Sequence, residues 1–87
     1  MSLCFPNDSR SYDASRNLVR FWGYDSALEI PFFLDVNALH KLVPQMRNEE
    51  AGYLEAFDAA LDRVRETARK VYSQSQRDAY LLQESDF

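Results

Sequence analysis

The sequence predicts an α+β fold, a small antiparallel β-sheet of three to four strands packed by one long α-helix and one short helix. Strand-like segments fill the first part of the chain and helix-like segments follow them, an order typical of α+β folds rather than of alternating α/β folds. The second half carries one long apolar stripe at helical spacing, which needs an apolar sheet face to cover it. A chain of 87 residues can bury one modest core, so residues 1–87 are predicted to form a single domain.

The N-terminal segment predicts little regular structure. The stretch from Pro6 to Ser9 (PNDS) disfavours both helices and central strands, so at most a short strand precedes it. Residues 11–13 are expected to be extended, and residues 14–17 are expected to turn the chain back.

Two apolar runs then predict a β-hairpin, LVRFWGYD over residues 18–25 and ALEIPFFL over residues 27–34. Alternate side chains of a strand point to opposite faces of the sheet. A two-residue loop at Asp25 and Ser26 would pair the inner side chains of the two runs as follows: Phe21 with Ile30, Val19 with Phe32 and Gly23 with Leu28. Pro31 cannot donate a hydrogen bond to a neighbouring strand, so we expect it at a sheet edge or a bulge.

A short helix is predicted after the hairpin. Asp35 is the expected N-cap of a helix over residues 36–43, because its carboxylate can accept hydrogen bonds from the first backbone amides. Pro44 ends this helix, since the residue before a proline avoids helical backbone angles.

A long helix is predicted over residues 49–73, with Asn48 as its N-cap. Its apolar positions are spaced 3, 4, 3, 4 and 3 residues apart, which places them on one face: Leu54, Phe57, Leu61, Val64, Ala68 and Val71. The polar residues 73–78 are expected to form a loop, and residues 79–83 a last short strand.

The side of the hairpin that faces away from the long helix is the best candidate for a functional surface. The long helix is expected to pack on Val19, Phe21, Leu28, Ile30 and Phe32. Leu18 lies on the other side, together with the candidate interaction surface: Arg20, Trp22, Tyr24 and Phe33. Tryptophan, tyrosine and arginine are the side chains most often found at binding hot spots.

Three arrangements of this surface remain open. The short helix can pack on it and bury Trp22 as a second core layer, in which case Arg20 stacks on Trp22 or pairs with Glu29 across the hairpin. A protein partner or a second copy of the chain can cover it. The bases of single-stranded nucleic acid can stack on its aromatic rings.

The predicted long helix is acidic in its first part and basic in its second. This division complements the helix dipole, because negative charge is favourable near the N-terminus and positive charge near the C-terminus. Alternatively, the basic residues form an anion-binding ridge of Arg63, Arg69, Lys70 and Arg77.

The sequence predicts no catalytic residue, no metal site and no cofactor, and therefore not an enzyme. His40 has no nucleophile at an informative spacing and is expected on the surface or at a helix end. Cys4 is the single cysteine, so we expect an inert thiol and no internal disulfide or structural zinc site. Gly23 and Gly52 are the only glycines, which excludes a glycine-rich phosphate loop.

Composition indicates a cytoplasmic protein without a membrane segment. The first residues, MSLCFPNDSR, lack both a basic start and a long apolar run, so no secretory signal is expected. No apolar stretch approaches the ~18 residues that a membrane span needs. The net charge of -4 argues against a nucleic-acid binder that works by bulk electrostatics.

Several stretches resemble a known family across nearly the whole chain: FPN near the start, SRSYDASRNLVRFWGYD, ALEIPFFLD, EAGYLEAFDA, the helix end RKVY and the closing DF. They are similar to a small bacterial family of uncharacterised proteins, the domain of unknown function 1488. This resemblance implies a compact α+β domain. It implies no activity, ligand or catalytic residue at any position of this chain.

The leading hypothesis from the sequence is a non-enzymatic cytoplasmic module for protein interaction or regulation. It would use the aromatic side of its hairpin against a protein partner or in a homodimer, because a chain this small has too little material for two full cores. The alternative is a single-stranded nucleic-acid binder that uses Trp22, Tyr24 and Arg20 together with the basic end of the long helix.

Overall fold

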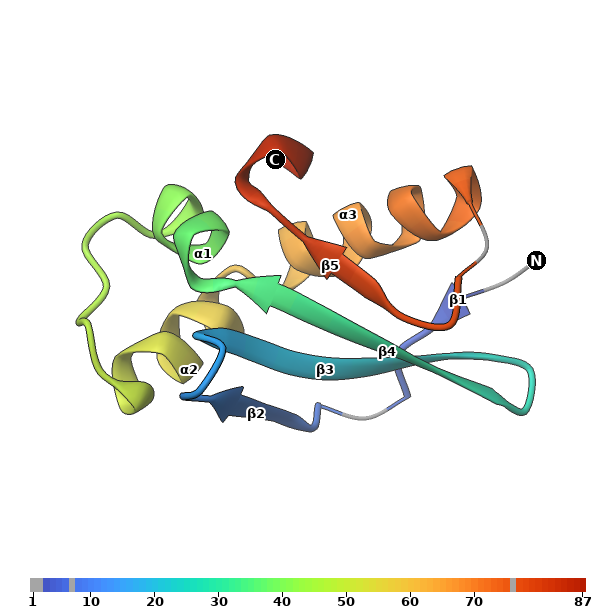
Figure 1. Cartoon of the computed structure of the whole chain (residues 1–87), viewed down its shortest axis with the longest axis horizontal. Helices are drawn as coiled ribbons and strands as arrows, with labels where there is room; N and C mark the ends of the chain where they lie inside the picture. The colour runs from blue at the N-terminus through green and yellow to red at the C-terminus, as the bar shows by residue number, and fades with distance from the viewer. Residues whose placement is uncertain (1–2, 7, 76) are drawn as a thin grey trace.

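The computed structural model describes residues 3–6, 8–75 and 77–87, which form a five-stranded sheet with α-helices on one side of it (Figure 1). The strands are β1 (Leu3–Cys4), β2 (Arg10–Asp13), β3 (Leu18–Asp25), β4 (Leu28–Asp35) and β5 (Tyr80–Leu82). The helices are α1 (Val36–Leu42), α2 (Glu50–Ala59), α3 (Leu61–Gln74) and the short 3-10 helix η1 (Glu84–Asp86). The predicted α+β class is confirmed. None of the helices in the described ranges has the length and apolar character needed to cross a bilayer.

The hairpin of β3 and β4 forms the centre of the sheet. Phe21 pairs with Phe32 and Val19 with Leu34, so the predicted partners are wrong by two residues. The loop is formed by Ser26 and Ala27 rather than by Asp25 and Ser26, because Ser26 takes a left-handed φ of 56° at the turn. A shift of two residues preserves the side of the sheet to which each side chain points, so the predicted facing is confirmed.

The sheet is mixed, so the predicted purely antiparallel arrangement is wrong. β1 and β2 both pair antiparallel with the edge of β3 that does not face β4, whereas β5 pairs parallel with β4. The parallel pairing follows from the connection, because the chain crosses over through α1, α2 and α3 before it returns beside β4. Pro31 lies just before the Phe32–Leu34 part of β4 that β5 pairs, in agreement with its predicted place at a sheet edge.

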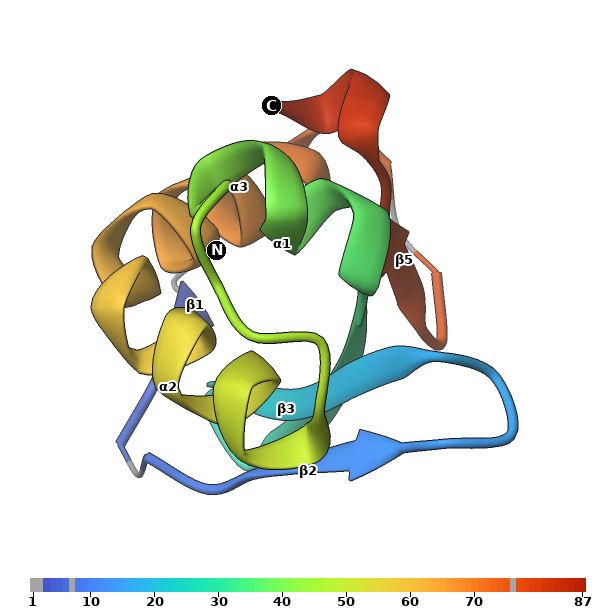
Figure 2. The same ribbon diagram turned by 90° about the vertical axis from the view of Figure 1, so that its left-hand side faces the viewer.

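The short helix is confirmed and its N-cap is Asp35, whose Oδ1 accepts a hydrogen bond from the backbone amide of Asn37 at 2.9 Å. Val36, Ala38 and Leu39 are its buried residues. All three helices lie on the same side of the sheet (Figure 2). The position of α1 therefore adds to the single core and forms no second layer.

The predicted single long helix is wrong, because it is divided into α2 and α3 at Ala60. Ala60 has φ −101° and ψ 14°, and it is buried. Backbone hydrogen bonds continue on both sides of the break, from Ala60 N to Ala56 O at 3.0 Å and from Val64 N to Ala60 O at 3.0 Å. The break therefore bends the helix without displacing its apolar stripe. Asn48 is not the cap; Glu49 holds that position and makes no side-chain capping bond.

The core lies between the inner sheet face and the helices. Phe57, Val64 and Ala68 of the predicted stripe are buried, and Leu54, Leu61 and Val71 are partly buried against them. From the sheet, Val19, Phe21, Ile30 and Phe32 reach the same cluster, and Tyr80 and Leu82 of the predicted last strand join it. Leu28 is on this face by alternation, as predicted, but it lies beside the hairpin loop, is 62% exposed and does not join the core cluster.

A buried tyrosine connects the hairpin tip to α3. The hydroxyl of Tyr72 donates a hydrogen bond to Asp25 Oδ2 at 2.6 Å. This bond and the burial of the phenol raise the pKa of Tyr72 to about 12, so the hydroxyl stays protonated at neutral pH.

Candidate interaction surface

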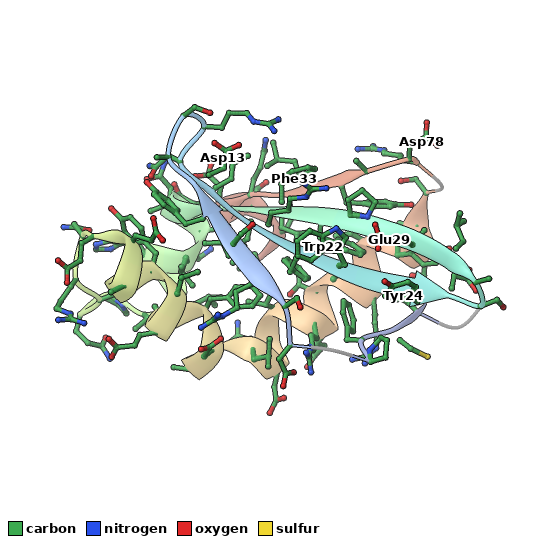
Figure 3. All side chains as sticks on the ribbon, turned by 90° about the horizontal axis from the view of Figure 1, so that it is seen from below. Asp13, Trp22, Tyr24, Glu29, Phe33 and Asp78 are labelled. Atoms are coloured by element: carbon green, nitrogen blue, oxygen red, sulfur yellow. The ribbon has the colours of Figure 1, made fainter. Side chains whose placement is uncertain are left out.

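The outer face of the sheet is the candidate site, and Figure 3 shows it with the helices behind the strands. Trp22, Tyr24 and Phe33 point toward the viewer there, with Glu29 beside them. We define the outer face as the side chains that alternate with the core positions of β3, β4 and β5: Leu18, Arg20, Trp22, Tyr24, Glu29, Pro31, Phe33 and Leu81. These side chains are half-buried or exposed, and the core cluster contains none of them. Burial of Trp22 in a second core layer is therefore wrong.

Arginine side chains stack on two aromatic rings of the outer face, those of Trp22 and Phe33. The guanidinium carbon of Arg20 lies 4.9 Å from the ring centre of Trp22 and 5.9 Å from that of Phe33. Arg16, from the turn between β2 and β3, lies 5.3 Å from the ring centre of Phe33. Such cation–π contacts are attractive and hold the cation over the ring.

The two arginines differ in their charge partners. Arg16 is held by Asp13, with Nε 3.0 Å from Oδ2. Among the residues that the structure describes, Arg20 forms no ion pair, and it stacks on Trp22 instead of pairing with Glu29. The exposed guanidinium of Arg20 therefore keeps its N–H donors available for a partner.

The acidic part of the outer face is formed by Glu29 on β4. Its Oε2 accepts a hydrogen bond from the hydroxyl of Tyr24 at 2.9 Å. That hydrogen bond and the charge of Glu29 raise the pKa of Tyr24. The Glu29 carboxylate has further acceptor positions beyond this bond, since a carboxylate can accept about four hydrogen bonds.

The register of the hairpin arranges these groups in order along the strands. Arg20 is opposite Phe33, Trp22 is opposite Pro31, and Tyr24 is opposite Glu29. The pair of Trp22 and Pro31 therefore lies between the pair that contains the basic Arg20 and the pair that contains the acidic Glu29. All four residues of the predicted surface, Arg20, Trp22, Tyr24 and Phe33, lie together on one face.

Glu29 and Leu81 belong to the outer face, and Arg16 contacts it by stacking on Phe33. These three residues were absent from the predicted set. Leu81 is 45% exposed and pairs with Phe33 across β4 and β5. The available signal for Arg16 was its position in the predicted turn, three residues after Asp13. Alternation of Glu29 with Leu28 and Ile30 was the signal for Glu29.

The basic residues of α3 do not join the outer face. Arg65 pairs with Asp8 at 3.0 Å, and Arg69 donates to the carbonyl of Leu3 at 3.4 Å. Both guanidinium groups also lie over the ring of Phe5, at 5.3 and 5.1 Å from its centre. These arginines hold the N-terminal segment against α3 on the helix side of the sheet.

The remaining candidate residues stand apart from one another. His40 is exposed on α1, and Cys4 is exposed on β1 opposite Tyr24. Within the described ranges, no group of three or more histidine, cysteine, aspartate or glutamate side chains is placed to hold a metal ion.

Comparisons with known proteins agree with this architecture. The family model described as protein of unknown function (DUF1488) matches residues 3–82. A crystal structure of a DUF1488 protein of unknown function from Shewanella loihica PV-4 superposes with a TM-score of 0.82 and 17% sequence identity, and the match covers 93% of this chain and 91% of that one. This likeness shows a shared fold. No curated protein matches the sequence. Since the family model spans most of its length, the chain belongs to the DUF1488 family of proteins of unknown function.

Proposed function

We propose that this chain is a cytoplasmic, non-enzymatic interaction module that binds a protein partner through the outer face of its sheet. One observation supports this most strongly: the described helices all pack on the inner side, so none of them covers the half-buried rings of Trp22, Tyr24 and Phe33 on the other side. Monomeric proteins seldom expose contiguous apolar patches beyond a few hundred Å², and larger patches usually mark binding surfaces.

The outer face is also suited to binding because its side chains are already ordered. Arg20 is stacked on Trp22, and the Tyr24 hydroxyl is held by Glu29. Side chains that are fixed before binding lose less conformational entropy when a partner arrives. Arginine, tryptophan and tyrosine therefore lie together in a form that favours a binding hot spot.

The alternative, binding of single-stranded nucleic acid, has less support. The basic residues of α3 that it needs lie on the helix side, where Arg65 and Arg69 contact the N-terminal segment. The outer face itself includes Glu29, whose charge would repel phosphate groups.

Replacing Trp22 by glutamate tests the proposed function. We expect Trp22→Glu to abolish association, with the chain's own copy or with another protein, because it places a charge at the centre of the apolar surface. Leu28→Glu is the matched control, since Leu28 is 62% exposed and lies off the outer face. Light scattering of the purified chains and co-purification from the native host measure association, and circular dichroism checks folding.

Two results would contradict the proposed binding of a protein by the outer face. The proposal fails if the wild-type chain recovers no partner and stays monomeric, or if both variants associate as the wild type does. Quenching of Trp22 fluorescence by single-stranded oligonucleotides at physiological salt, weakening as salt is added, would favour the alternative instead.

A further inference from the structure

We infer that the partner of the outer face is a second copy of this chain, related by a two-fold axis that pairs Arg20 of each copy with Glu29 of the other. The inference rests on the proposed function and adds the identity of the partner. It depends on the order of charges along the hairpin.

That order makes the outer face complementary to itself. Arg20 precedes Trp22 by two residues on β3, and Glu29 precedes Pro31 by two residues on β4. Because β3 and β4 are antiparallel and Trp22 pairs with Pro31, the two charges lie on opposite sides of this central pair. The levels of Arg20 and Glu29 are separated by four residues, roughly 13 Å along the strand.

Consider a two-fold axis that lies between the two sheets, runs across the strands and passes at the level of Trp22 and Pro31. This axis brings the level of Arg20 in one copy to the level of Glu29 in the other. It places Arg20 of one copy over the Tyr24 and Glu29 level of the other, and the symmetry forms the same contact twice. The long arginine side chain can span the ~4.8 Å between neighbouring strands to reach the carboxylate on β4. The N–H donors of Arg20, which bind no carboxylate among the described residues of a single chain, would then bind Glu29 of the other copy.

The competing two-fold arrangement is disfavoured by the same charges. An axis parallel to the strands would leave Arg20 at the level of Arg20 in the other copy and Glu29 at the level of Glu29. Like charges opposite each other across an interface are costly. Charge therefore selects the axis that crosses the strands.

The apolar side chains fit the centre of such an interface. Trp22 and Pro31 would meet their own counterparts near the axis, and two sheets packed face to face stand about 10 Å apart, which aromatic side chains can fill. Strands of eight residues, as in β3 and β4, are about 27 Å long, and the sheet is only a few strands wide. A surface of this size is at the low end for a specific interface, so we expect a weak dimer with a micromolar dissociation constant.

Charge exchange between the two residues tests the inference. In a dimer of the Arg20→Glu variant, the new glutamate of each copy faces Glu29 of the other copy, so both contacts become repulsive. In a dimer of the Glu29→Arg variant, the new arginine of each copy faces Arg20 of the other copy, with the same effect. Each variant should raise the dissociation constant at least tenfold in sedimentation velocity. An equimolar mixture of the two variants restores both opposite-charge pairs in the mixed dimer, so association should return toward the wild-type value. A chain carrying both changes should dimerise with itself for the same reason.

The matched controls are Arg63→Glu and Glu66→Arg, which make the same charge changes at exposed positions of α3. They should leave the dissociation constant unchanged. If a charge reversal prevents folding, Arg20→Gln and Glu29→Gln should each still weaken the dimer without opposing like charges.

Three outcomes would overturn the inference. The wild-type chain can remain monomeric up to roughly 1 mM, a concentration at which even a weak dimer is populated. The single charge reversals can leave a dimer as strong as the wild type, or the mixture can fail to restore it. If the chain stays monomeric but another protein binds it in a Trp22-dependent manner, this inference fails while the proposed function stands.

Discussion

Replacement of Phe57 by alanine is expected to lower the free energy of unfolding by about 3–5 kcal/mol, because it leaves a large cavity in the core. Phe57 is 2% exposed, and its ring centre lies 5.2 Å from that of Phe21 on the inner sheet face. It therefore holds α2 against the sheet. A loss of this size is a large share of the ~5–15 kcal/mol that typically stabilises a domain. Urea denaturation followed by circular dichroism measures it.

Leu61→Ala is the matched comparison from the same apolar stripe. Leu61 is only partly buried, so its truncation removes less contact and should cost about 1–2 kcal/mol. A loss for Phe57→Ala no larger than that for Leu61→Ala would mean that α2 does not pack as described.

Replacement of Gly52 by alanine is expected to destabilise the fold by about 1–3 kcal/mol, the usual cost of forcing extra atoms into a packed site. Propensity alone predicts the opposite sign, because alanine stabilises a helix by ~1 kcal/mol relative to glycine. In α2, however, a Cβ on Gly52 would meet backbone atoms of Arg47 and would lie 2.8 Å from its Cβ. The loop before α2 would have to move away from the helix.

The control for this substitution is its neighbour, since Ala51 is exposed on the same helix. Ala51→Gly should cost only the propensity difference, up to about 1 kcal/mol. Thermal melts of the two variants decide the sign, and a Gly52→Ala chain that melts above the wild type would rule out the close contact between Arg47 and α2.

The hairpin was predictable because strand alternation determines which side chains share a face. Phe21 and Phe32 lie on the inner face and Trp22 and Phe33 on the outer face whether the loop begins at Asp25 or at Ser26. The exact partners were not predictable, because both loops preserve this facing and serine is not a residue that usually signals a left-handed turn position.

The division of the long helix was not predictable from local signals. Alanine has the highest helix propensity, so Ala60 carries no mark of a break. The bend is a tertiary effect, because α2 packs near β2 and β3 whereas α3 packs near β5. The parallel direction of β5 depends on the same path of the helices and was missed for the same reason.

The residues of the candidate surface were predictable from the sequence, but whether a helix covers them was not. Arg20, Trp22, Tyr24 and Phe33 share a face by alternation alone. Whether α1 would cover them depends on the direction in which the chain leaves β4, which short-range sequence patterns do not encode. In the structure Ala38 and Leu39 join the inner core, so α1 leaves the outer face open.

Quenching of Trp22 fluorescence by acrylamide tests the assignment of the outer face as the binding surface most directly, because Trp22 is the only tryptophan in the chain. The quenching constant is measured as the purified chain is concentrated, or as a co-purified partner is added, while light scattering follows the mass. We expect the quenching constant to fall as the mass rises, since association would remove the half-buried indole from solvent. A mass that rises while the quenching constant stays the same would place the interface elsewhere and contradict the assignment.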